Sequence, residues 1–365
     1  MSRFVRLCET ASPTGSEAEV GELVRVELEA LGLTVAEDNA AEAAGAGCGN
    51  LHCLIEGQGE GWVAFCAHLD TVPHEGPIEV VLDGDEVYRS AGETILGADN
   101  KAAIAVMIEL AAGLVEEPAP TGVELLFTVA EETGLRGAAA FDRTSLVSER
   151  MFVLDLAEEI GRIVTRSPFY HRLTARITGV EAHAGLVPEE GRSAIVAASR
   201  AIAAMELGRL DDHTTANVGL IKGGTAPNVV PGQCALVGEA RSLDPTRAAQ
   251  VAGEMAQAIA SAASESGCEV EVETAILHQG YEVPDDSPAL ALAEQALSAS
   301  GFEPERVSTG GGSDVNIFRP EGIDALLLAN GTFANHTADE NVPRANLVAM
   351  LEVCRALVEG APEHC

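Results

Sequence analysis

The fold is decided by the stretch Gly61–Asp70, which reads GWVAFCAHLD. Within it, Val63 to Ala67 form a short apolar run typical of a buried strand, and the run ends abruptly at His68. Because alternate side chains of a strand point to one face, His68 and Asp70 are expected to point the same way. The Asp70 carboxylate could then accept a hydrogen bond from one imidazole nitrogen and leave the other free for a metal ion. A lone His-x-Asp is more often a structural pair, so its meaning depends on the residues downstream.

Acidic residues stand at the ends of two further apolar segments. The strand predicted at Gly122–Ala130 is followed by Glu131 and Glu132, and the strand predicted at Met151–Leu156 carries Asp155 near its end. Adjacent carboxylates repel each other and are costly when buried, unless a cation compensates. A solvated turn is the alternative for the glutamate pair. In α/β sheets, sites lie beyond the carboxyl ends of the strands, so we expect these acids to converge with the His-x-Asp pair.

Two more candidates lie outside the strands. Asp99 occurs in GETILGADNKAAIAVMIEL at Gly92–Leu110, at or just before the start of an Ala- and Ile-rich helix. The simple role for such an aspartate is an N-cap, and a second role in metal binding requires a spare carboxylate oxygen. His336 belongs to the polar run Asn335–Glu340, which follows an apolar strand predicted at Ala325–Ala329.

The candidate metal ligands are therefore two imidazoles and three carboxylates: His68, Asp99, Glu132, Asp155 and His336. This set suits a pair of divalent cations, with zinc favoured and cobalt or manganese tolerated. One carboxylate must bridge the pair. Cations about 3.5–4 Å apart can hold one hydroxide between them and polarise a carbonyl. Glu131, next to a ligand, could take the proton of the water and pass it to a leaving amine.

The rest of the chain predicts an inserted domain at residues 169–277, between a first catalytic part at 1–168 and a second at 278–365. Strands and helices in the insertion are expected in the order β-α-β-β-α-β, which is that of a split βαβ module. The expected fold class is α/β: a catalytic domain with a mixed sheet flanked by helices, and an inserted α+β, ferredoxin-like lid. Near the start, Ser16–Leu31 predicts a helix with Ser16 as N-cap and Glu19 completing a capping box.

Composition limits the classes of function. The net charge of −35 gives a surface that repels phosphate backbones and anionic membranes, which argues against nucleic-acid and membrane partners. No apolar run reaches the roughly 18 residues needed to cross a bilayer, and the first residues lack the apolar region of a signal peptide. Eight scattered cysteines without a C-x-x-C pair fit reduced thiols. We therefore expect a cytoplasmic protein.

Seven motifs occur in order over about residues 4–358: HLDTVP, LGADNKAAIA, TVAEETGLRGA, VEAHAGLVPEEGRSAI, GGTAPNVVP, GGGSDVNIF and NHTADENV. Together they resemble the motifs of the M20 metallopeptidase family, most closely its peptidase T-like (tripeptidase-like) branch. The resemblance implies a zinc-peptidase catalytic domain that binds two Zn²⁺ per chain. His68 and Asp155 would hold one ion, Glu132 and His336 the other, and Asp99 would bridge them.

The same resemblance implies roles for neighbouring residues. Asp70 would orient His68, Glu131 would be the general base, and the peptide bond from Asp99 to Asn100 would be cis. His183, in the lid motif GVEAHAG, would stabilise the tetrahedral oxyanion. It would act from the same chain or from a partner subunit, whereas a lone loop histidine is usually structural.

Four lid or linker residues are candidates for substrate binding: Asn228, Arg241, Gly311 and Gly312. Asn228, in GGTAPNVVP, resembles a substrate-contacting asparagine, and a turn asparagine is the alternative. Arg241 could clamp a substrate carboxylate with two hydrogen bonds, or form a surface ion pair with Asp244. The glycines of GGGSD would let a ligand approach the backbone, or form a tight turn.

The expected activity is hydrolysis of amide bonds in short peptides by an aminopeptidase- or tripeptidase-like enzyme. Aspartate at position 155 resembles the family's aminopeptidase-like and dipeptidase-like members, which favours cleavage near a free N-terminus. The text after it, LAEEIG, departs from the glycine-rich text of true peptidase T, which counts against a strict tripeptidase and predicts a different amine pocket. An N-acyl amino acid amidohydrolase or carboxypeptidase with the same machinery remains an alternative, as does a non-catalytic, metal-stabilised binding protein. A homodimer through the lid and a monomer are both open.

Overall fold

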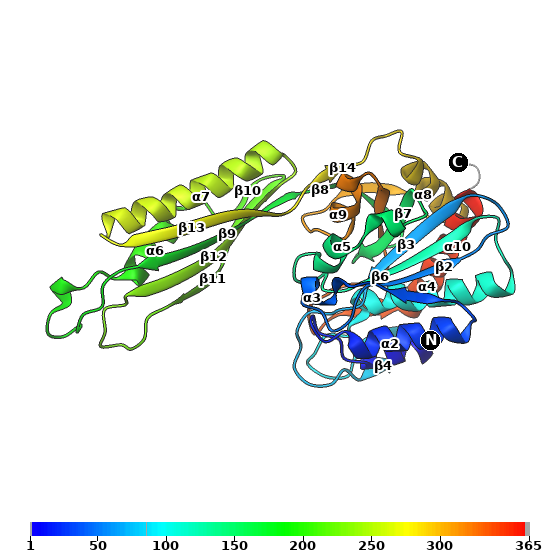
Figure 1. Ribbon diagram of the computed structural model, residues 1–365, viewed down its shortest axis with the longest axis horizontal. Coiled ribbons are helices and arrows are strands. Elements are labelled where there is room, and N and C mark those ends of the chain that lie inside the picture. Colours follow the sequence, from blue (N-terminus) through cyan, green and yellow to red (C-terminus); the bar gives the residue numbers. More distant parts are fainter. Residues whose placement is uncertain (1, 85, 362–365) are drawn as a thin grey trace. The chain divides into compact units, whose positions relative to one another are not determined.

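The computed structural model describes residues 2–84 and 86–361 of the 365-residue chain. Within the described residues the backbone forms two compact units (Figure 1). The first unit is built from Met1–Thr165, Glu282–Ser308 and Ser313–Cys365, and the second from Arg166–Tyr281 and Thr309–Gly312. The insertion predicted at residues 169–277 lies inside the second unit.

A mixed sheet forms the centre of the first unit. Its strands are β1 (Val35–Glu37), β2 (Leu51–Ile55), β3 (Trp62–His68), β6 (Gly122–Thr128), β7 (Arg150–Leu156), β8 (Arg162–Ser167), β14 (Tyr281–Glu282), β15 (Glu305–Ser308) and β16 (Asp324–Ala329). They run in the order β1-β2-β6-β3-β7-β16-β8-β14 in the described residues, with β15 beside β8. The central strands β6, β3, β7 and β16 are parallel, whereas β1, β2 and β8 pair antiparallel with their neighbours.

The parallel strands bring the predicted strand ends together. β3 and β6 are buried along nearly their whole length, as is typical of parallel strands covered on both faces. In the register, His68 lies beside Thr128, and Cys66 lies beside Val153 of β7. The three strands therefore end at one edge of the sheet, and the predictions of strands before the His-x-Asp pair, the glutamate pair and Asp155 are confirmed.

Helices flank this sheet, as predicted. They are α1 (Ser2–Glu9), α2 (Ala18–Ala30), α3 (Ala40–Ala44), α4 (Ala98–Glu116), α5 (Arg136–Ala140), α8 (Pro288–Ala299), α9 (Val315–Phe318) and α10 (Arg344–Gly360). α4 packs against β3 and β7, α8 against β7 and β16, and α9 against β16. A small antiparallel sheet of β4 (Val80–Leu82), β5 (Val87–Ser90) and β17 (Asn341–Pro343) lies beside them in the first unit.

The capping box predicted for α2 is wrong. The helix begins at Ala18, and Glu17 at its N-cap position makes no side-chain bond to the helix. Instead, the buried Glu17 carboxylate accepts hydrogen bonds from the backbone N–H groups of Gly15 and Gly47. This carboxylate joins the start of α2 to the loop after α3, and a pattern of local residues cannot reveal such a distant contact.

The second unit is an antiparallel sheet with α6 and α7 on one face (Figure 1). Its elements are β9 (Phe169–Thr178), α6 (Ala194–Ala204), β10 (Gly208–Asp211), β11 (Thr214–Gly223), β12 (Gln233–Ser242), α7 (Pro245–Glu265) and β13 (Glu269–His278). The strand order is β10-β11-β12-β9-β13. This is the predicted ferredoxin-like lid with one addition, because β10 pairs with β11 as an extra edge strand.

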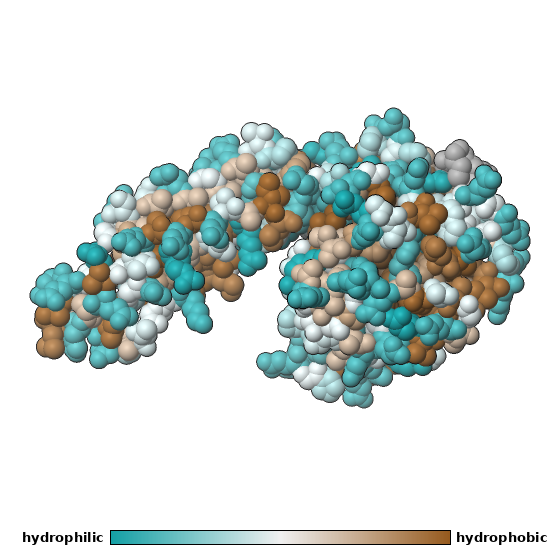
Figure 2. All heavy atoms as spheres, in the orientation of Figure 1, coloured by the Kyte–Doolittle hydropathy of each residue, from teal (hydrophilic) through white to brown (hydrophobic). Residues whose placement is uncertain are grey.

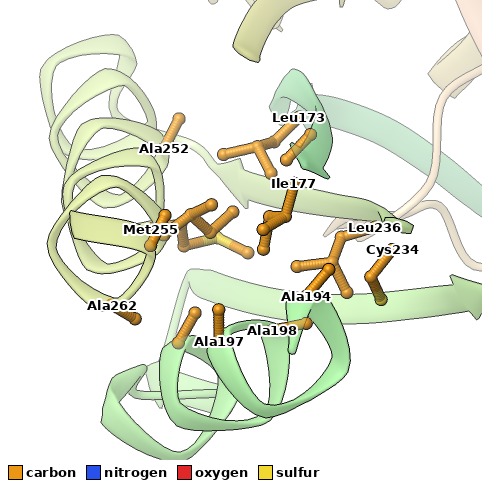
Figure 3. Close-up of a cluster of buried hydrophobic side chains, with 14 of the residues drawn as sticks. Leu173, Ile177, Ala194, Ala197, Ala198, Cys234, Leu236, Ala252, Met255 and Ala262 are labelled. Atoms are coloured by element: carbon orange, nitrogen blue, oxygen red, sulfur yellow. The ribbon is translucent and has the colours of Figure 1, made fainter. Parts of the chain in front are cut away.

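Small side chains let the helices of the second unit approach its sheet closely. Leu173 and Ile177 of β9 and Leu236 of β12 point toward α6 and α7, where Met255 meets them (Figure 3). α6 contributes mainly alanines to this core. The alternate residues of β9 and β12 face the other side of the sheet, where they are mostly polar and partly or fully exposed.

Hydrophilic side chains are spread over the visible surface of both units (Figure 2), in keeping with 57 acidic and 22 basic residues. Among the described helices, none combines the length and the apolar character that crossing a membrane requires. The cysteines in the described residues are free thiols.

Candidate metal centre

His68 is oriented at the end of β3 by the residue two positions later. Its Nδ1 lies 2.9 Å from the main-chain carbonyl oxygen of Asp70 and 3.6 Å from Asp70 Oδ1. A carbonyl oxygen only accepts, so Nδ1 carries a proton, and in the neutral ring that a metal ion requires Nε2 would offer the lone pair. This Nε2 lies 3.1 Å from Asp99 Oδ1 and 3.3 Å from Asp155 Oδ1. The buried ring therefore points Nε2 to the place where two carboxylates meet. Although burial opposes it, the charge and the hydrogen bond of Asp155 raise the pKa of His68 well above its ordinary value.

The Asp70 carboxylate contacts more than His68. We expected this carboxylate to be the imidazole's partner, but the shortest contact of the ring is with the Asp70 main chain. The carboxylate oxygens instead accept the hydroxyl of Thr14 and the backbone N–H groups of Glu131 and Glu132 at 2.7, 2.9 and 3.2 Å. Although burial opposes it, hydrogen bonds from His68, Thr14 and Glu131 hold the pKa of Asp70 below its ordinary value. Asp70 thus fixes both the histidine and the backbone of the glutamate pair.

Asp99 lies between the two histidines. Its Oδ1 is 3.1 Å from His68 Nε2, and its Oδ2 is 3.0 Å from His336 Nε2. The N-cap position of α4 is Gly97, so the simple capping role does not apply. The Asp99–Asn100 peptide bond is cis, as the resemblance implied. Despite burial, hydrogen bonds from both histidines hold the pKa of Asp99 below its ordinary value. One oxygen facing each imidazole is the arrangement that a bridging ligand needs.

Glu132 and His336 face each other beside Asp99. His336 Nε2 lies 3.0 Å from Glu132 Oε1. The histidine stands on the loop after β16 with a φ of +66°, and its side chain is 49% exposed. Hydrogen bonds to Asp99 and Glu132 raise the pKa of His336 to about 10. The loop therefore brings the second imidazole to the same edge of the sheet as β3 and β6.

Glu131 and Asp155 complete the cluster. Together with His68 they offer three ligand atoms that all lie within 4.8 Å of one another, and His68, Asp99 and Glu132 form a second such group. Burial, followed by the charge of Asp99, raises the pKa of Asp155 to about 8. Burial and then the charge of Asp155 raise the pKa of Glu131 well above its ordinary value. These shifts indicate uncompensated negative charge, which a divalent cation would neutralise.

Glu340 was given no role from the sequence, yet it fixes the loop that carries Asp99. Its Oε2 accepts the N–H groups of Leu96 and Gly97 at 2.8 Å each, and its Oε1 accepts the N–H of Asp99 at 2.9 Å. The side chain is 1% exposed. The motif NHTADENV contains this residue, but nothing in the text distinguishes the buried Glu340 from the exposed Asp339 beside it.

The two residues that follow Asp99 were also missed. Asn100 Nδ2 donates to Asp155 Oδ1 at 3.0 Å, so it fixes the orientation of that carboxylate. Lys101 is 1% exposed, and its Nζ donates to Ser12 Oγ at 2.6 Å. Burial lowers the pKa of Lys101. An amide and a lysine directly after an acid at a helix start are a signal of such support, although the sequence alone does not give their partners.

Asp314, in the GGGSD motif, is buried in the first unit. Its Oδ2 accepts the hydroxyl of Thr128 at 2.6 Å and the thiol of Cys66 at 3.7 Å. Burial raises the pKa of Asp314 to about 6. Its negative charge contributes to the raised pKa of Glu131, so this carboxylate belongs to the surroundings of the cluster.

His183 and Asn228 lie on neighbouring loops of the second unit. His183 pairs with Val229 through an isolated bridge, and the N–H of Ala184 donates to the main-chain oxygen of Asn228 at 2.9 Å. Both side chains are exposed. His183 Nδ1 accepts the N–H of Gly185 at 3.2 Å, which leaves Nε2 as the donor of the neutral ring. The loop therefore selects the tautomer that an oxyanion donor needs.

Arg241 of β12 does not form the predicted alternative pair with Asp244. Asp244 caps α7 by accepting the N–H of Thr246 at 2.8 Å. Arg241 instead contacts Glu239, with Nε and Oε1 3.1 Å apart. Arg241 thus forms an ion pair within the lid, but its partner is Glu239 and the predicted partner Asp244 is wrong. The substrate clamp stays a prediction.

The two predicted site glycines differ in their surroundings. A Cβ on Gly312 would lie 2.4 Å from Nε2 of His278, whereas a Cβ on Gly311 would meet only Thr309 Oγ1 at 3.6 Å. Packing against His278 is therefore a sufficient reason for glycine at position 312. The role of both glycines in substrate binding stays a prediction.

Comparison with known proteins agrees with this geometry. Residues 170–267 match the peptidase dimerisation domain of M20 enzymes, and residues 50–165 match peptidase family M28. The uncharacterized protein YqjE of Bacillus subtilis is 37% identical over 364 residues, which cover 99% of this chain and 98% of YqjE. A crystal structure of the aminopeptidase PepT from Bacillus cereus is 35% identical with a TM-score of 0.85. A tripeptidase structure from Staphylococcus aureus is 32% identical with a TM-score of 0.91. Each structure match covers 99% of this chain and 97% of the other.

A mixed α/β sheet with an inserted ferredoxin-like unit and a strand-end cluster of imidazoles and carboxylates defines a metal-dependent hydrolase. The chain belongs to the M20 family of metallopeptidases, in its peptidase T-like branch.

Proposed function

We propose that the protein is a di-zinc aminopeptidase or tripeptidase that cleaves short peptides near a free N-terminus. The observation that carries the proposal is the contact of one carboxylate, Asp99, with both His68 and His336. Similarity over nearly the whole chain to an aminopeptidase and a tripeptidase supports the substrate class. The aspartate at position 155 supports cleavage near a free amine.

The donor set fits two divalent cations. His68 and Asp155 would hold one zinc ion, Glu132 and His336 would hold the other, and Asp99 would be shared between them. Cobalt or manganese would suit the same nitrogen and oxygen donors. Two such cations would lower the pKa of a bound water molecule and polarise the scissile carbonyl.

Glu131 is the proposed general base. Its backbone N–H is fixed by the Asp70 carboxylate, and its carboxylate lies beside His68 and Asp155. It would take the proton of the attacking water and deliver it to the leaving amine. His183 would donate its Nε2–H to the developing oxyanion, either within one chain or from a partner subunit.

The substrate would be held by lid residues and by the glycine run. Arg241 would bind a carboxylate of the substrate, Asn228 would bind its backbone, and Gly311 and Gly312 would line its path. The match of residues 170–267 to a dimerisation domain supports a homodimer through the lid. Free thiols in the described residues support work in the reducing cytoplasm.

The decisive test is a Glu131→Ala variant loaded with zinc. We expect about two zinc ions per chain, as in the wild type, and a turnover of a tripeptide that falls by roughly 10²–10⁴. Glu149→Ala, an exposed acid just before β7 and at the opposite end of that strand from Asp155, is the matched control and should keep full turnover. Unchanged turnover in Glu131→Ala would end the proposal. Loss of one zinc ion would instead make Glu131 a ligand, since it also lies near His68 and Asp155.

A substrate panel decides between the related activities. We expect free tripeptides and dipeptides to be hydrolysed and N-blocked peptides to be resistant, because the amine end is recognised. Preference for N-acetyl amino acids would indicate that the enzyme is an amidohydrolase and not a peptidase. Release of C-terminal residues from N-blocked peptides would indicate a carboxypeptidase. No hydrolysis by protein with about two zinc ions bound would favour a non-catalytic binding protein.

A further inference from the structure

The guanidinium of Arg241 is held from three directions inside the second unit. Nε and Nη2 donate to the two carboxylate oxygens of Glu239 at 3.1 Å each, and Nη1 donates to the carbonyl oxygen of Gly310 at 3.2 Å. The guanidinium carbon lies 4.1 Å above the centre of the Tyr170 ring. These contacts fix both the position and the plane of the guanidinium.

The contacts leave part of the fork free. A guanidinium has five N–H donors, and Glu239 and Gly310 accept three of them. Of the two that remain, one is on Nη1 and the other is on Nη2. Donors on the two terminal nitrogens can bind both oxygens of a carboxylate at once. Arg241 can therefore donate two hydrogen bonds to a carboxylate while it keeps its hydrogen bonds within the protein.

Glu239 neutralises most of the charge that this fork would offer. It stands two residues before Arg241 on β12, so both side chains point to the same face of the sheet. The side chains of Arg241 and Glu239 are only 24% and 29% exposed, so water screens the pair incompletely. The fork consequently provides well-placed hydrogen bonds and little net positive charge.

Tyr170 connects the two members of the pair. It lies directly opposite Arg241 in the register of β9 and β12. The pKa of Tyr170 is raised first by burial and then by the charge and the hydrogen bond of Glu239, so the phenol donates to this carboxylate. The far side of the ring is packed, because His278 meets it edge-on with ring centres 5.5 Å apart. His278 has room there only because position 312 is a glycine.

We propose that Tyr170 and Glu239 are positioning residues that control how Arg241 recognises the C-terminal carboxylate of a short peptide. Tyr170 fixes the direction of the fork, and Glu239 limits its charge. The inference rests on the proposed peptidase function. It narrows the substrate class to short peptides with a free C-terminal carboxylate. Because the Arg241 cation is already paired with Glu239, the expected preference for the free acid over a neutral C-terminal amide is moderate.

The test compares one tripeptide with its C-terminal amide and uses the ratio of the two kcat/KM values. In Arg241→Lys the ratio should fall by about tenfold, mainly through a higher KM for the free acid, since a pair of fixed hydrogen bonds to the carboxylate is lost. In Glu239→Gln the ratio should rise several-fold through a lower KM for the acid, because the fork regains its charge. Tyr170→Leu should lower the ratio, and Tyr170→Phe should lower it less because the ring remains.

The matched control is Arg176→Gln, an exposed arginine on the same face of β9. It lies six residues from Tyr170, or roughly 20 Å along the strand, and should leave the ratio unchanged. A parallel fall in kcat for both peptides with an unchanged ratio in the Arg241 and Glu239 variants would overturn the inference and leave the peptidase function standing. Failure of the wild type to hydrolyse either peptide would overturn the proposed function itself.

Discussion

The two units hold their candidate functional side chains in different ways. At the sheet edge of the first unit, His68, Asp70 and Asp99 are nearly buried, and each contacts several partners. In the second unit, His183 and Asn228 are exposed and belong to loops that short-range main-chain contacts hold together. Substitution of one buried ligand should therefore disturb the other ligands that share its contacts. Substitution of one exposed donor should remove only the function of that donor. The comparison therefore predicts a decreasing series of effects.

Asp99→Ala should have the largest effect. In the described part of the chain, Asp99 is the carboxylate that contacts both imidazoles, so its removal should release both zinc ions. We expect metal content to fall from about two ions per chain to near zero and peptide turnover to fall below detection. Metal analysis after gel filtration and a tripeptide assay measure this. Asp286→Ala, an exposed aspartate of the same unit, is the control. Two retained zinc ions in Asp99→Ala would contradict a shared ligand.

The same contrast explains what could be predicted from the sequence. Apolar runs that end in an acid or a histidine are recognisable in a sequence, so β3, β6 and β7 could be predicted. The structure brings the five predicted metal-binding residues to one edge of the sheet. The split βαβ order could also be predicted, because polar and apolar residues alternate along its strands. Motif resemblance added the cis bond at Asp99, which is confirmed, and the assignment of ligands to each ion, which stays a prediction.

Supporting contacts between distant segments could not be predicted. Glu340 holds the Asp99 loop from more than two hundred residues away, and Glu17 holds Gly47 where a local capping box was expected. In both cases a buried carboxylate accepts backbone N–H groups, and the sequence does not show which acid is buried. The partner of Arg241 was wrong for a related reason, because Asp244 caps α7 and Arg241 contacts Glu239.

His183→Ala tests the exposed side of the comparison and should have the next largest effect. Loss of an oxyanion donor should lower kcat by roughly 10²–10³ and leave the zinc content unchanged. His213→Ala, which removes another exposed histidine of the second unit, is the control and should keep full activity. Steady-state kinetics and metal analysis on the same samples measure both values. If kcat stays at the wild-type level, or if zinc is lost, the exposed loop does not supply an oxyanion donor.

Glu340→Gln should have a smaller effect, because it acts through the backbone. The amide keeps one acceptor for the Asp99 loop but places an N–H₂ group where a backbone N–H must be accepted. We expect zinc affinity to fall by about 10–100-fold, as is typical for residues that support ligands. Competition with a fluorescent chelator measures this. Asp339→Asn is the matched control, because Asp339 is the neighbouring residue in the sequence and its side chain is exposed. Equal zinc affinity in the two variants would show that the Glu340 contacts do not position Asp99.

The smallest expected effect is a pH dependence of stability that zinc removes. In chelator-treated protein the pKa of Asp155 is raised from 3.8 to about 8, so the folded state binds more protons than the unfolded state between these values. His336, raised from 6.5 to about 10, acts in the same direction at higher pH. Stability should therefore be fully present at low pH and should fall as pH rises through the folded pKa values. From pH 6 to 8 the loss should be on the order of 2 kcal/mol from Asp155, with less from the half-exposed His336 because solvent screens it.

Bound zinc would keep both groups deprotonated as its proposed ligands, so the fall in stability should disappear in the loaded protein. Melting temperatures at pH 6, 7, 8 and 9, with zinc and with chelator, measure this difference. His183→Ala should reproduce the wild-type curves under both conditions, because that loop is exposed and carries no part of the buried charge. Identical pH slopes with and without zinc would show that the strand-end carboxylates are not the groups that the metal neutralises, and the contrast between the two units would lose its electrostatic basis.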